Sequence, residues 1–216
     1  MLAALYVLPA DTTLDYTGLP QLASAMPYDI RGHSATLKVE GSTVVVESTT
    51  EYRNRGDGGT ATILVPRRRS GDANSGQPTF TIEATWDKKP VKLNPVAPRG
   101  ASERVDARNT TYSSDLSVSV PFAKQATHAL RLRATLALGR TGRAPQKHIA
   151  GYLLEGGVPI GTLNVAYRYG PPTVFDLPTV APALGWQVGT TGAFVRKTNY
   201  TPKGDVATIA FYPGGF

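Results

Sequence analysis

The clearest alternation in the sequence is HALRLRATLAL, residues 128–138. Its apolar positions recur at every second residue, with Leu130, Leu132, Ala134, Leu136 and Leu138 on one side and Arg131, Arg133, Thr135 and Ala137 on the other. Successive side chains of a β-strand point to opposite faces of the sheet. The alternation therefore predicts a strand with one packed and one solvated face, which is typical of antiparallel sheets.

The same period of two, or a short β-branched run, recurs along the rest of the chain, and no helical period lasts three turns. It predicts strands at residues 35–40, 43–52, 60–65, 79–86, 115–120, 128–138, 149–154, 161–169, 193–197 and 206–212. Gly41-Ser42 predicts a two-residue hairpin turn between the first two. We expect an all-β fold: an antiparallel β-sandwich, either one elongated sandwich or two small consecutive ones.

Two proline-rich stretches interrupt this pattern. Residues 91–109 lack any period and predict a linker or long crossover, so we expect residues 35–100 and 101–216 to be the two parts of the sandwich. Residues 170–186 hold too many prolines for a central strand and predict an extended surface excursion.

Residues 1–34 are expected to be an N-terminal arm or the remnant of an export segment. The opening run MLAALYVLPADTTL is too short to cross a bilayer and lacks the basic region of a secretory signal. Ala23-Ser24-Ala25 offers a signal-cleavage pattern, although its spacing is poor. No transmembrane segment is expected in this chain.

The composition excludes some kinds of functional site and favours some kinds of partner. The chain has no cysteine, which excludes disulfides, thiolate metal sites and cysteine nucleophiles. Its formal net charge is +7, and the excess lies in the second half, where residues 109–216 hold 10 basic and 4 acidic side chains. Such a charge favours anionic partners, or it serves only solubility.

Basic side chains gather in three places along the chain. Arg67, Arg68 and Arg69 follow a strand-ending proline, Lys88, Lys89 and Lys92 follow Trp86, and Arg140, Arg143 and Lys147 lie in a stretch with no acidic residue. If the loops of the first and third groups meet at one end of the sandwich, they would form a patch for an anionic polymer. Few aromatic residues lie near them, which makes nucleic acid an unlikely partner. The alternative is that they are separately solvated loops.

The tripeptide Arg55-Gly56-Asp57 raises the question of an adhesion signal. It lies in RNRGDGG, whose Asn, Gly and Asp residues are those that a turn requires. We interpret the stretch as the turn of a hairpin between the strands at 43–52 and 60–65.

No catalytic constellation is recognisable. Nucleophile motifs are absent, and His33, His128 and His148 are far apart in sequence, without the spacing of a metal site. The glycine-rich stretches at 56–59 and 156–161 lack the context of a phosphate loop. We expect neither an enzyme nor a cofactor.

Residues 35–93 resemble a known family. They contain a strand, Gly41, a β-branched strand ending in Tyr52-Arg53-Asn54, a strand ending at Val65-Pro66, and FTIEATWDKKPVKL. This order is similar to the opening of inter-α-trypsin-inhibitor-type (VIT) domains and to uncharacterised exported bacterial β-sandwich proteins. Gly185-Trp186 and Thr198-Asn199-Tyr200-Thr201-Pro202 continue the likeness to the exported group. The resemblance implies an all-β, extracytoplasmic and non-enzymatic module, and it carries over no functional residue.

The sequence therefore favours a non-enzymatic binding or scaffolding module in the periplasm or at the cell surface, with an anionic polymer or another protein as partner. One alternative is a carbohydrate-binding or carbohydrate-active sandwich that recognises an acidic polysaccharide through the basic loops, with Trp86, Tyr112 or Trp186 as a stacking platform. A second is a small capsid-type sandwich, although the chain lacks a basic N-terminal arm for packaging nucleic acid.

Overall fold

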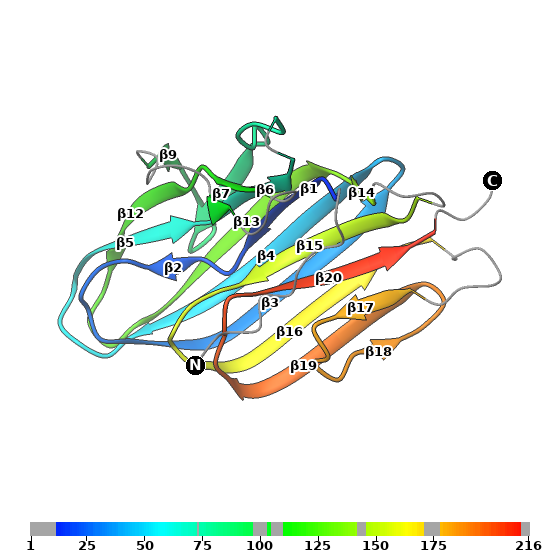
Figure 1. The fold of residues 1–216 in the computed structure, drawn as a ribbon. Coiled ribbons are helices and arrows are strands. Elements are labelled where there is room, and N and C mark those ends of the chain that lie inside the picture. Colours follow the sequence, from blue (N-terminus) through cyan, green and yellow to red (C-terminus); the bar gives the residue numbers. More distant parts are fainter. Residues whose placement is uncertain are drawn as a thin grey trace.

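A computed structural model describes residues 12–72, 74–96, 103–104, 110–141, 146–170 and 178–212. Within these ranges the chain is all-β, and no helix is long and apolar enough to span a membrane. The strands form three sheets, here named A, B and C, which pack as a β-sandwich (Figure 1).

Sheet C forms one layer and contains the strand predicted at residues 128–138. Its order is β18 (Gln187–Val188), β19 (Gly192–Tyr200), β16 (Ile160–Arg168), β3 (Tyr28–Glu40), β4 (Thr43–Asn54), β13 (Thr127–Ala137), β7 (Ile82–Trp86) and β8 (Lys89–Val91). The alternation expected in β13 is confirmed, because its leucines are buried and its arginines are exposed. The hairpin at Gly41-Ser42 is also present: Glu40 pairs with Thr43, and Gly41 has a φ of 61° that favours glycine.

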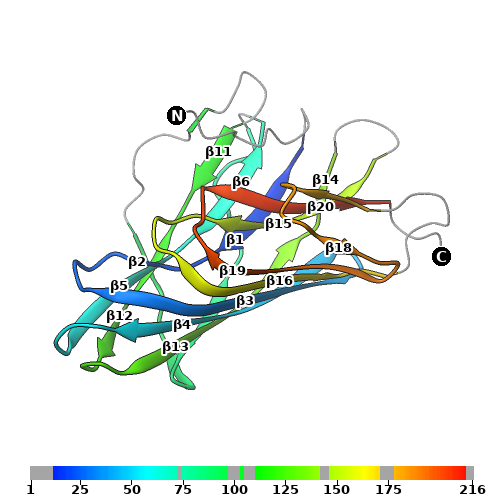
Figure 2. The same ribbon diagram turned by 90° about the horizontal axis from the view of Figure 1, so that it is seen from below.

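Sheets A and B form the second layer. Sheet A has the order β10 (Glu103–Arg104), β11 (Thr110–Ser113), β6 (Arg67–Gly71), β1 (Leu14–Gly18), β15 (His148–Leu154), β20 (Asp205–Phe211) and β17 (Thr179–Ala181), with β14 (Gly139–Arg140) paired to β15. Sheet B has the order β2 (Gln21–Leu22), β5 (Gly59–Val65), β12 (Leu116–Phe122) and β9 (Asn94–Pro95). Figure 2 shows the two layers from the side, with β6, β1, β15 and β20 of sheet A above β16, β3, β4 and β13 of sheet C.

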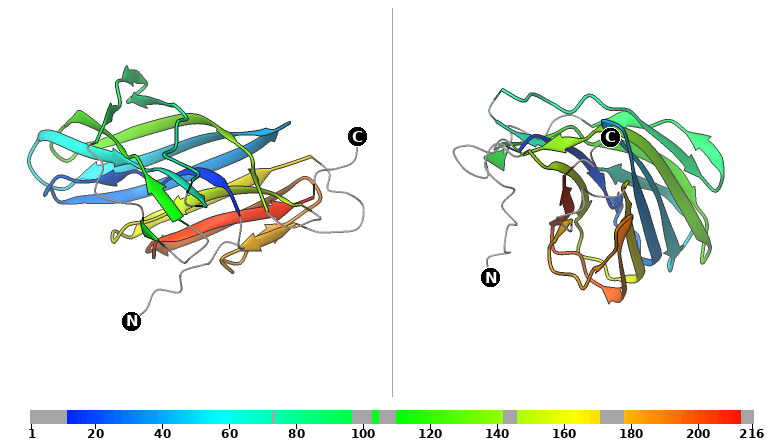
Figure 3. Two further views of the ribbon diagram at one scale, coloured as in Figure 1. Left: turned by 45° about the horizontal axis from the view of Figure 1, so that its top comes forward. Right: turned by 90° about the vertical axis from the view of Figure 1, so that its right-hand side faces the viewer.

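One apolar core joins the three sheets. Leu37 and Leu132 of sheet C, Ile63 of sheet B, and Tyr152 and Ile209 of sheet A belong to the same buried cluster. The end-on view on the right of Figure 3 shows sheet C as a curved layer with β15 and β20 on its inner side. Apolar side chains from the facing layers thus fill a common interior, as in sheet-on-sheet packing.

Strands from both sides of residue 100 pair within every sheet. β4 pairs with β13 in sheet C, β5 pairs with β12 in sheet B, and β1 pairs with β15 in sheet A. The parts expected at 35–100 and 101–216 therefore do not form separate sheets. Residues 12–34 are likewise built into the sheets, through β1, β2 and the start of β3.

All ten predicted strands are present; nine have bounds within three residues of those expected, and β3 begins seven residues earlier than the predicted strand at 35–40. Two pairs are parallel, β1 with β15 and β3 with β16, although the expected sheets were antiparallel. Both join segments that are far apart in sequence, and a strand's own residues do not reveal the direction of such a partner. The short strands β1, β2, β6, β8–β11, β14, β17 and β18 were not predicted, because most of them are too brief or too polar to show a period.

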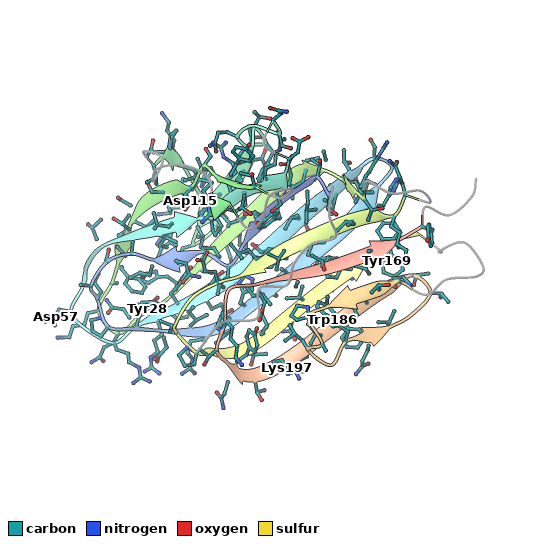
Figure 4. All side chains as sticks on the ribbon, viewed as in Figure 1. Tyr28, Asp57, Asp115, Tyr169, Trp186 and Lys197 are labelled. Carbon is teal, nitrogen blue, oxygen red and sulfur yellow. The ribbon has the colours of Figure 1, made fainter. Side chains whose placement is uncertain are left out.

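The interpretation of RNRGDGG as a hairpin turn is wrong. β4 belongs to sheet C and β5 to sheet B, so this stretch carries the chain from one layer to the other. The Asn54 side chain, which is fully buried, donates hydrogen bonds to the carbonyl oxygens of Phe122 and Ala123, at 3.1 and 3.0 Å, where β12 returns toward β13. The two interlayer crossings are therefore tied together, at the end of the molecule where Figure 4 labels Asp57.

Both charged residues of the tripeptide have partners within the protein. Arg55 forms an ion pair with Asp29, and Asp57 lies 2.8 Å from the Lys124 ammonium. Gly56 packs closely on Pro27, since a Cβ atom at this glycine would lie 2.8 Å from the proline ring. These contacts hold the tripeptide in place within the protein, so we assign it a structural role.

Candidate binding site on β16 and β19

The three consecutive arginines lie on a strand rather than on a loop. Arg67, Arg68 and Arg69 form most of β6, in the middle of sheet A. The Arg67 guanidinium donates hydrogen bonds to the carbonyl oxygens of Ser114, at 2.9 Å, and Phe80, at 3.1 Å, and burial lowers its pKa. Its side chain therefore holds neighbouring segments of the protein together.

Arg68 and Arg69 are engaged by carboxylates. Arg68 forms an ion pair with Asp115. The Arg69 guanidinium donates two hydrogen bonds, of 2.7 and 2.8 Å, to the Asp15 carboxylate, and these bonds raise the pKa of the arginine. The Asp15 side chain is only 7% exposed, so the pair belongs to the sheet interior. All three arginines thus have protein partners in this structure.

The other basic group is distributed around β14. Arg140 lies on β14, where its amide donates a hydrogen bond to Thr13, and the Lys147 ammonium lies 4.9 Å from the centre of the Tyr212 ring. Arg143 lies outside the described residues. Because Thr13 and β1 stand between β14 and β6, the structure does not place Arg140 beside the arginine triplet.

The three histidines occupy separate environments. His33 is buried in the core, His128 pairs with Asp87, and His148 packs against Phe211 with ring centres 6.0 Å apart. No group of three potential metal ligands occurs in the described part of the chain.

Asp87 and His128 resemble part of a catalytic triad, but their hydrogen bonds give them a different role. His128 Nδ1 lies 2.6 Å from an Asp87 oxygen, while Nε2 accepts a hydrogen bond of 3.1 Å from the Ala123 amide. In a triad, Nε2 must be free to accept a proton from the nucleophile. Here that lone pair is occupied by the backbone, and the ring is stacked on Trp86 at 5.1 Å. The pair therefore fastens the β7–β8 turn to β13.

A different surface has the features of a binding site. An open groove of about 740 Å³ lies against β16, β19 and the turn that precedes β19, and its lining includes Asn164, Ala166, Arg168, Thr191 and Phe194. We call it the β16–β19 groove. Its volume falls in the range of small-molecule sites.

One of the two exposed large hydrophobic side chains of the described residues lines this groove. Phe194 is 49% exposed and Val188 is 37% exposed. Phe194 lines the groove, whereas Val188 is opposite Ala193 in the register of β18 and β19 and therefore lies on the other face of this strand pair. Exposed apolar residues are common on proteins, whereas a large aromatic ring exposed in the wall of a concave surface is informative.

Charge is segregated on the same part of sheet C. β16, β18 and β19 contain no aspartate or glutamate, while they carry Arg168, Arg196 and Lys197. Arg168 and Arg196 are exposed, and neither forms an ion pair within the ranges that the structure describes. Both lie on the face of Phe194, because residues two apart on a strand, or opposite each other on paired strands, share a face.

The backbone behind the groove is held firmly. The Tyr169 hydroxyl donates a hydrogen bond of 2.7 Å to the Gly189 carbonyl, and the Tyr169 amide donates one of 3.1 Å to Thr191. Gly192 permits the close approach of the turn, because a Cβ atom there would lie 2.7 Å from the Tyr167 carbonyl oxygen. Trp186 packs on Tyr167 with ring centres 5.5 Å apart, near the labelled Lys197 in Figure 4.

Sequence reasoning did not identify Arg168, Phe194 or Arg196. The alternation of Ala193 and Val195 with Phe194 was the available signal, because it directs the phenylalanine outward once the small and β-branched residues face the core. The expected stacking platforms are engaged elsewhere. Trp86 is buried, and the Trp186 ring nitrogen donates a hydrogen bond of 2.9 Å to Pro182. The Tyr112 hydroxyl donates one of 3.3 Å to Asp72.

Comparison with known proteins finds no matching family model and no match among curated proteins. Among solved structures, the chain is similar to a candidate nutrient-binding protein from Legionella pneumophila, with a TM-score of 0.68 and 10% identity over 94% of this chain and 72% of that one. It also aligns with an M1 zinc metallopeptidase from Deinococcus radiodurans, with a TM-score of 0.41 and 13% identity over 90% of this chain and 44% of the peptidase. The first likeness shows a shared fold and the second is too weak to support an argument.

Proposed function

We propose that this chain is a non-enzymatic ligand-binding β-sandwich module that acts outside the cytoplasm and binds its ligand in the β16–β19 groove. The observation that carries the proposal is that Phe194, the exposed aromatic side chain of the described residues, lines that groove. An exposed aromatic ring in the wall of a concave surface that also presents polar side chains is a common basis for ligand recognition.

Two further observations support a binding role. The sandwich is similar in fold to a candidate nutrient-binding protein, over 94% of this chain. The Asp87–His128 pair, which comes nearest to a catalytic arrangement, uses its second ring nitrogen for a backbone hydrogen bond. The extracytoplasmic location rests on the resemblance to exported β-sandwich proteins.

The experiment is a ligand screen by NMR saturation transfer against monosaccharides, neutral and acidic oligosaccharides, amino acids and short peptides. Each ligand is tested with the unmodified protein, with Phe194→Ser, and with Thr135→Ala as a matched exposed control on β13 of the same sheet. We expect a ligand whose signal is lost in Phe194→Ser and kept in Thr135→Ala. Ligands that bind equally well to all three proteins would place the binding surface elsewhere.

A further inference from the structure

We infer that the ligand of the β16–β19 groove is an acidic oligosaccharide, with a sugar ring against Phe194 and carboxylate or sulfate groups held by Arg168 and Arg196. This inference rests on the proposed function and specifies the ligand of the same site.

The first support is the order of side chains across the pair of strands. Phe194 is opposite Ala166 in the register of β16 and β19, Arg196 is opposite Asn164, and Arg168 is opposite Gly192. The two arginines therefore flank the phenylalanine on opposite sides, and the strand rise and spacing separate their Cα atoms by about 14 Å. An anion would meet a guanidinium group on either side of an apolar surface.

The second support is that these cations have no competing acid close by. β16, β18 and β19 lack carboxylates, and the acids of neighbouring β3 are already paired, Asp29 with Arg55 and Glu40 with Lys38. A guanidinium group binds carboxylate or sulfate with paired, charge-assisted hydrogen bonds. The groove therefore complements an anion through groups that the protein does not itself neutralise.

The third support distinguishes a sugar chain from other anions. Two cations separated by an aromatic ring suit an elongated ligand with repeated acidic groups better than a single small anion. Asn164 can both donate and accept hydrogen bonds, and Thr191 offers a hydroxyl, which suits the hydroxyl groups of a sugar. Single-stranded nucleic acid stacks successive bases on several aromatic rings, whereas Phe194 is the exposed aromatic residue of the described chain.

The test measures affinity by isothermal titration for oligogalacturonate and for a heparin-derived oligosaccharide, at about 50 and about 200 mM salt. Maltohexaose serves as a neutral sugar, oligo-glutamate as an acidic peptide and oligo-dT as a nucleic acid. The variants are Phe194→Ser, the pair Arg168→Gln/Arg196→Gln, and the control pair Arg131→Gln/Arg133→Gln. The control pair lowers the net charge equally on the exposed face of β13 in the same sheet.

We expect an acidic oligosaccharide to bind the unmodified protein, and Phe194→Ser and the groove pair to weaken it by about tenfold or more. The control pair should change the affinity by less than about twofold, because its arginines do not flank Phe194. Circular dichroism and thermal unfolding verify that each variant is folded.

Several outcomes would overturn the inference. Maltohexaose binding that depends on Phe194 but not on the two groove arginines would retain the proposed function and reject the acidic ligand. Tighter binding of oligo-glutamate or oligo-dT, with the same dependence on Phe194, would retain the site and change its ligand class. Equal losses in the control and groove pairs, with no effect of Phe194→Ser, would reject both the inference and the proposed site.

Discussion

His33 of β3 and Tyr152 of β15 are joined across the core by a hydrogen bond of 2.9 Å between the imidazole Nε2 and the phenol oxygen. Their rings are stacked with centres 5.6 Å apart, and His33 Nδ1 lies 2.8 Å from the Thr50 hydroxyl. This polar link connects sheet C to sheet A inside the protein. The histidine is 2% exposed, and burial lowers its pKa to about 3.

The buried histidine predicts a loss of stability in mild acid. The unfolded chain protonates His33 below a pKa of about 6.5, whereas the folded protein keeps it neutral down to about 3. The unfolded state therefore binds more protons in this window. The free energy of unfolding should fall as pH drops from about 6.5 toward 3, by at most about 1.4 kcal/mol per pH unit from this group.

Urea denaturation at about pH 7, 6 and 5 measures this slope before most carboxylates titrate. His33→Gln should be less stable at neutral pH but show a flatter dependence. His148→Gln is the matched control, since burial lowers the pKa of His148 as well but its site is less enclosed. An unchanged slope in His33→Gln would mean that other groups cause the acid sensitivity.

The interlayer joint at Asn54 should be intolerant of substitution. Its side-chain amide donates to the carbonyl oxygens of Asp57, Phe122 and Ala123, and its oxygen accepts a bond of 2.8 Å from the Gly56 amide. Asn54→Ala leaves buried carbonyl groups without a donor, so we expect a destabilisation of about 3 kcal/mol.

Chemical denaturation of Asn54→Ala and Asn54→Asp checks this. The aspartate keeps the acceptor for Gly56 but directs negative charge at the three carbonyl oxygens, so it should be at least as destabilising. Arg53→Ala, at the exposed neighbouring position, should change stability by less than about 0.5 kcal/mol. Similar stabilities for all three variants would show that the joint is not held by Asn54.

The Asp15–Arg69 pair predicts coupling between two strands of sheet A. Arg69→Met removes the partner of a carboxylate that is 7% exposed, and breaking such a pair should cost about 3 kcal/mol. Combining it with Asp15→Asn should recover part of the loss, because the buried charge is removed as well. A double-mutant cycle measures this coupling, and purely additive effects would contradict it. Binding at the β16–β19 groove should be unchanged in each variant.

The turn between β7 and β8 offers a stabilising substitution. Asp87 and Lys88 both have positive φ angles, 48° and 68°, a conformation that costs a side-chain-bearing residue free energy. Lys88→Gly should raise stability by about 1 kcal/mol. Asp87→Gly should instead lower it, because the Asp87 carboxylate accepts bonds from Ala129 and His128. Thermal unfolding distinguishes the two, and a lower melting temperature for Lys88→Gly would contradict this account.

The residues of β13 and the hairpin at Gly41 were predictable because their signals are local. Alternation along one strand states which side chains face the core, and Gly41 supplies the positive φ that its turn needs. The stretch after Asn54 was misread for the complementary reason. A polar, glycine-rich turn has the same composition whether its flanking strands pair with each other or belong to different layers. Here the distant partners of the two strands decide: β4 pairs with β13, and β5 pairs with β12.

The same division applies to the candidate site. The amino-acid sequence was enough to predict an all-β chain without cysteine and with its positive charge concentrated in the second half. Which cations have partners depends on the fold, which places Asp15 against Arg69, 54 positions away, and leaves Arg168 and Arg196 beside Phe194. Charge is a property of single residues, whereas neutralisation depends on strand register, which packing of the whole core determines.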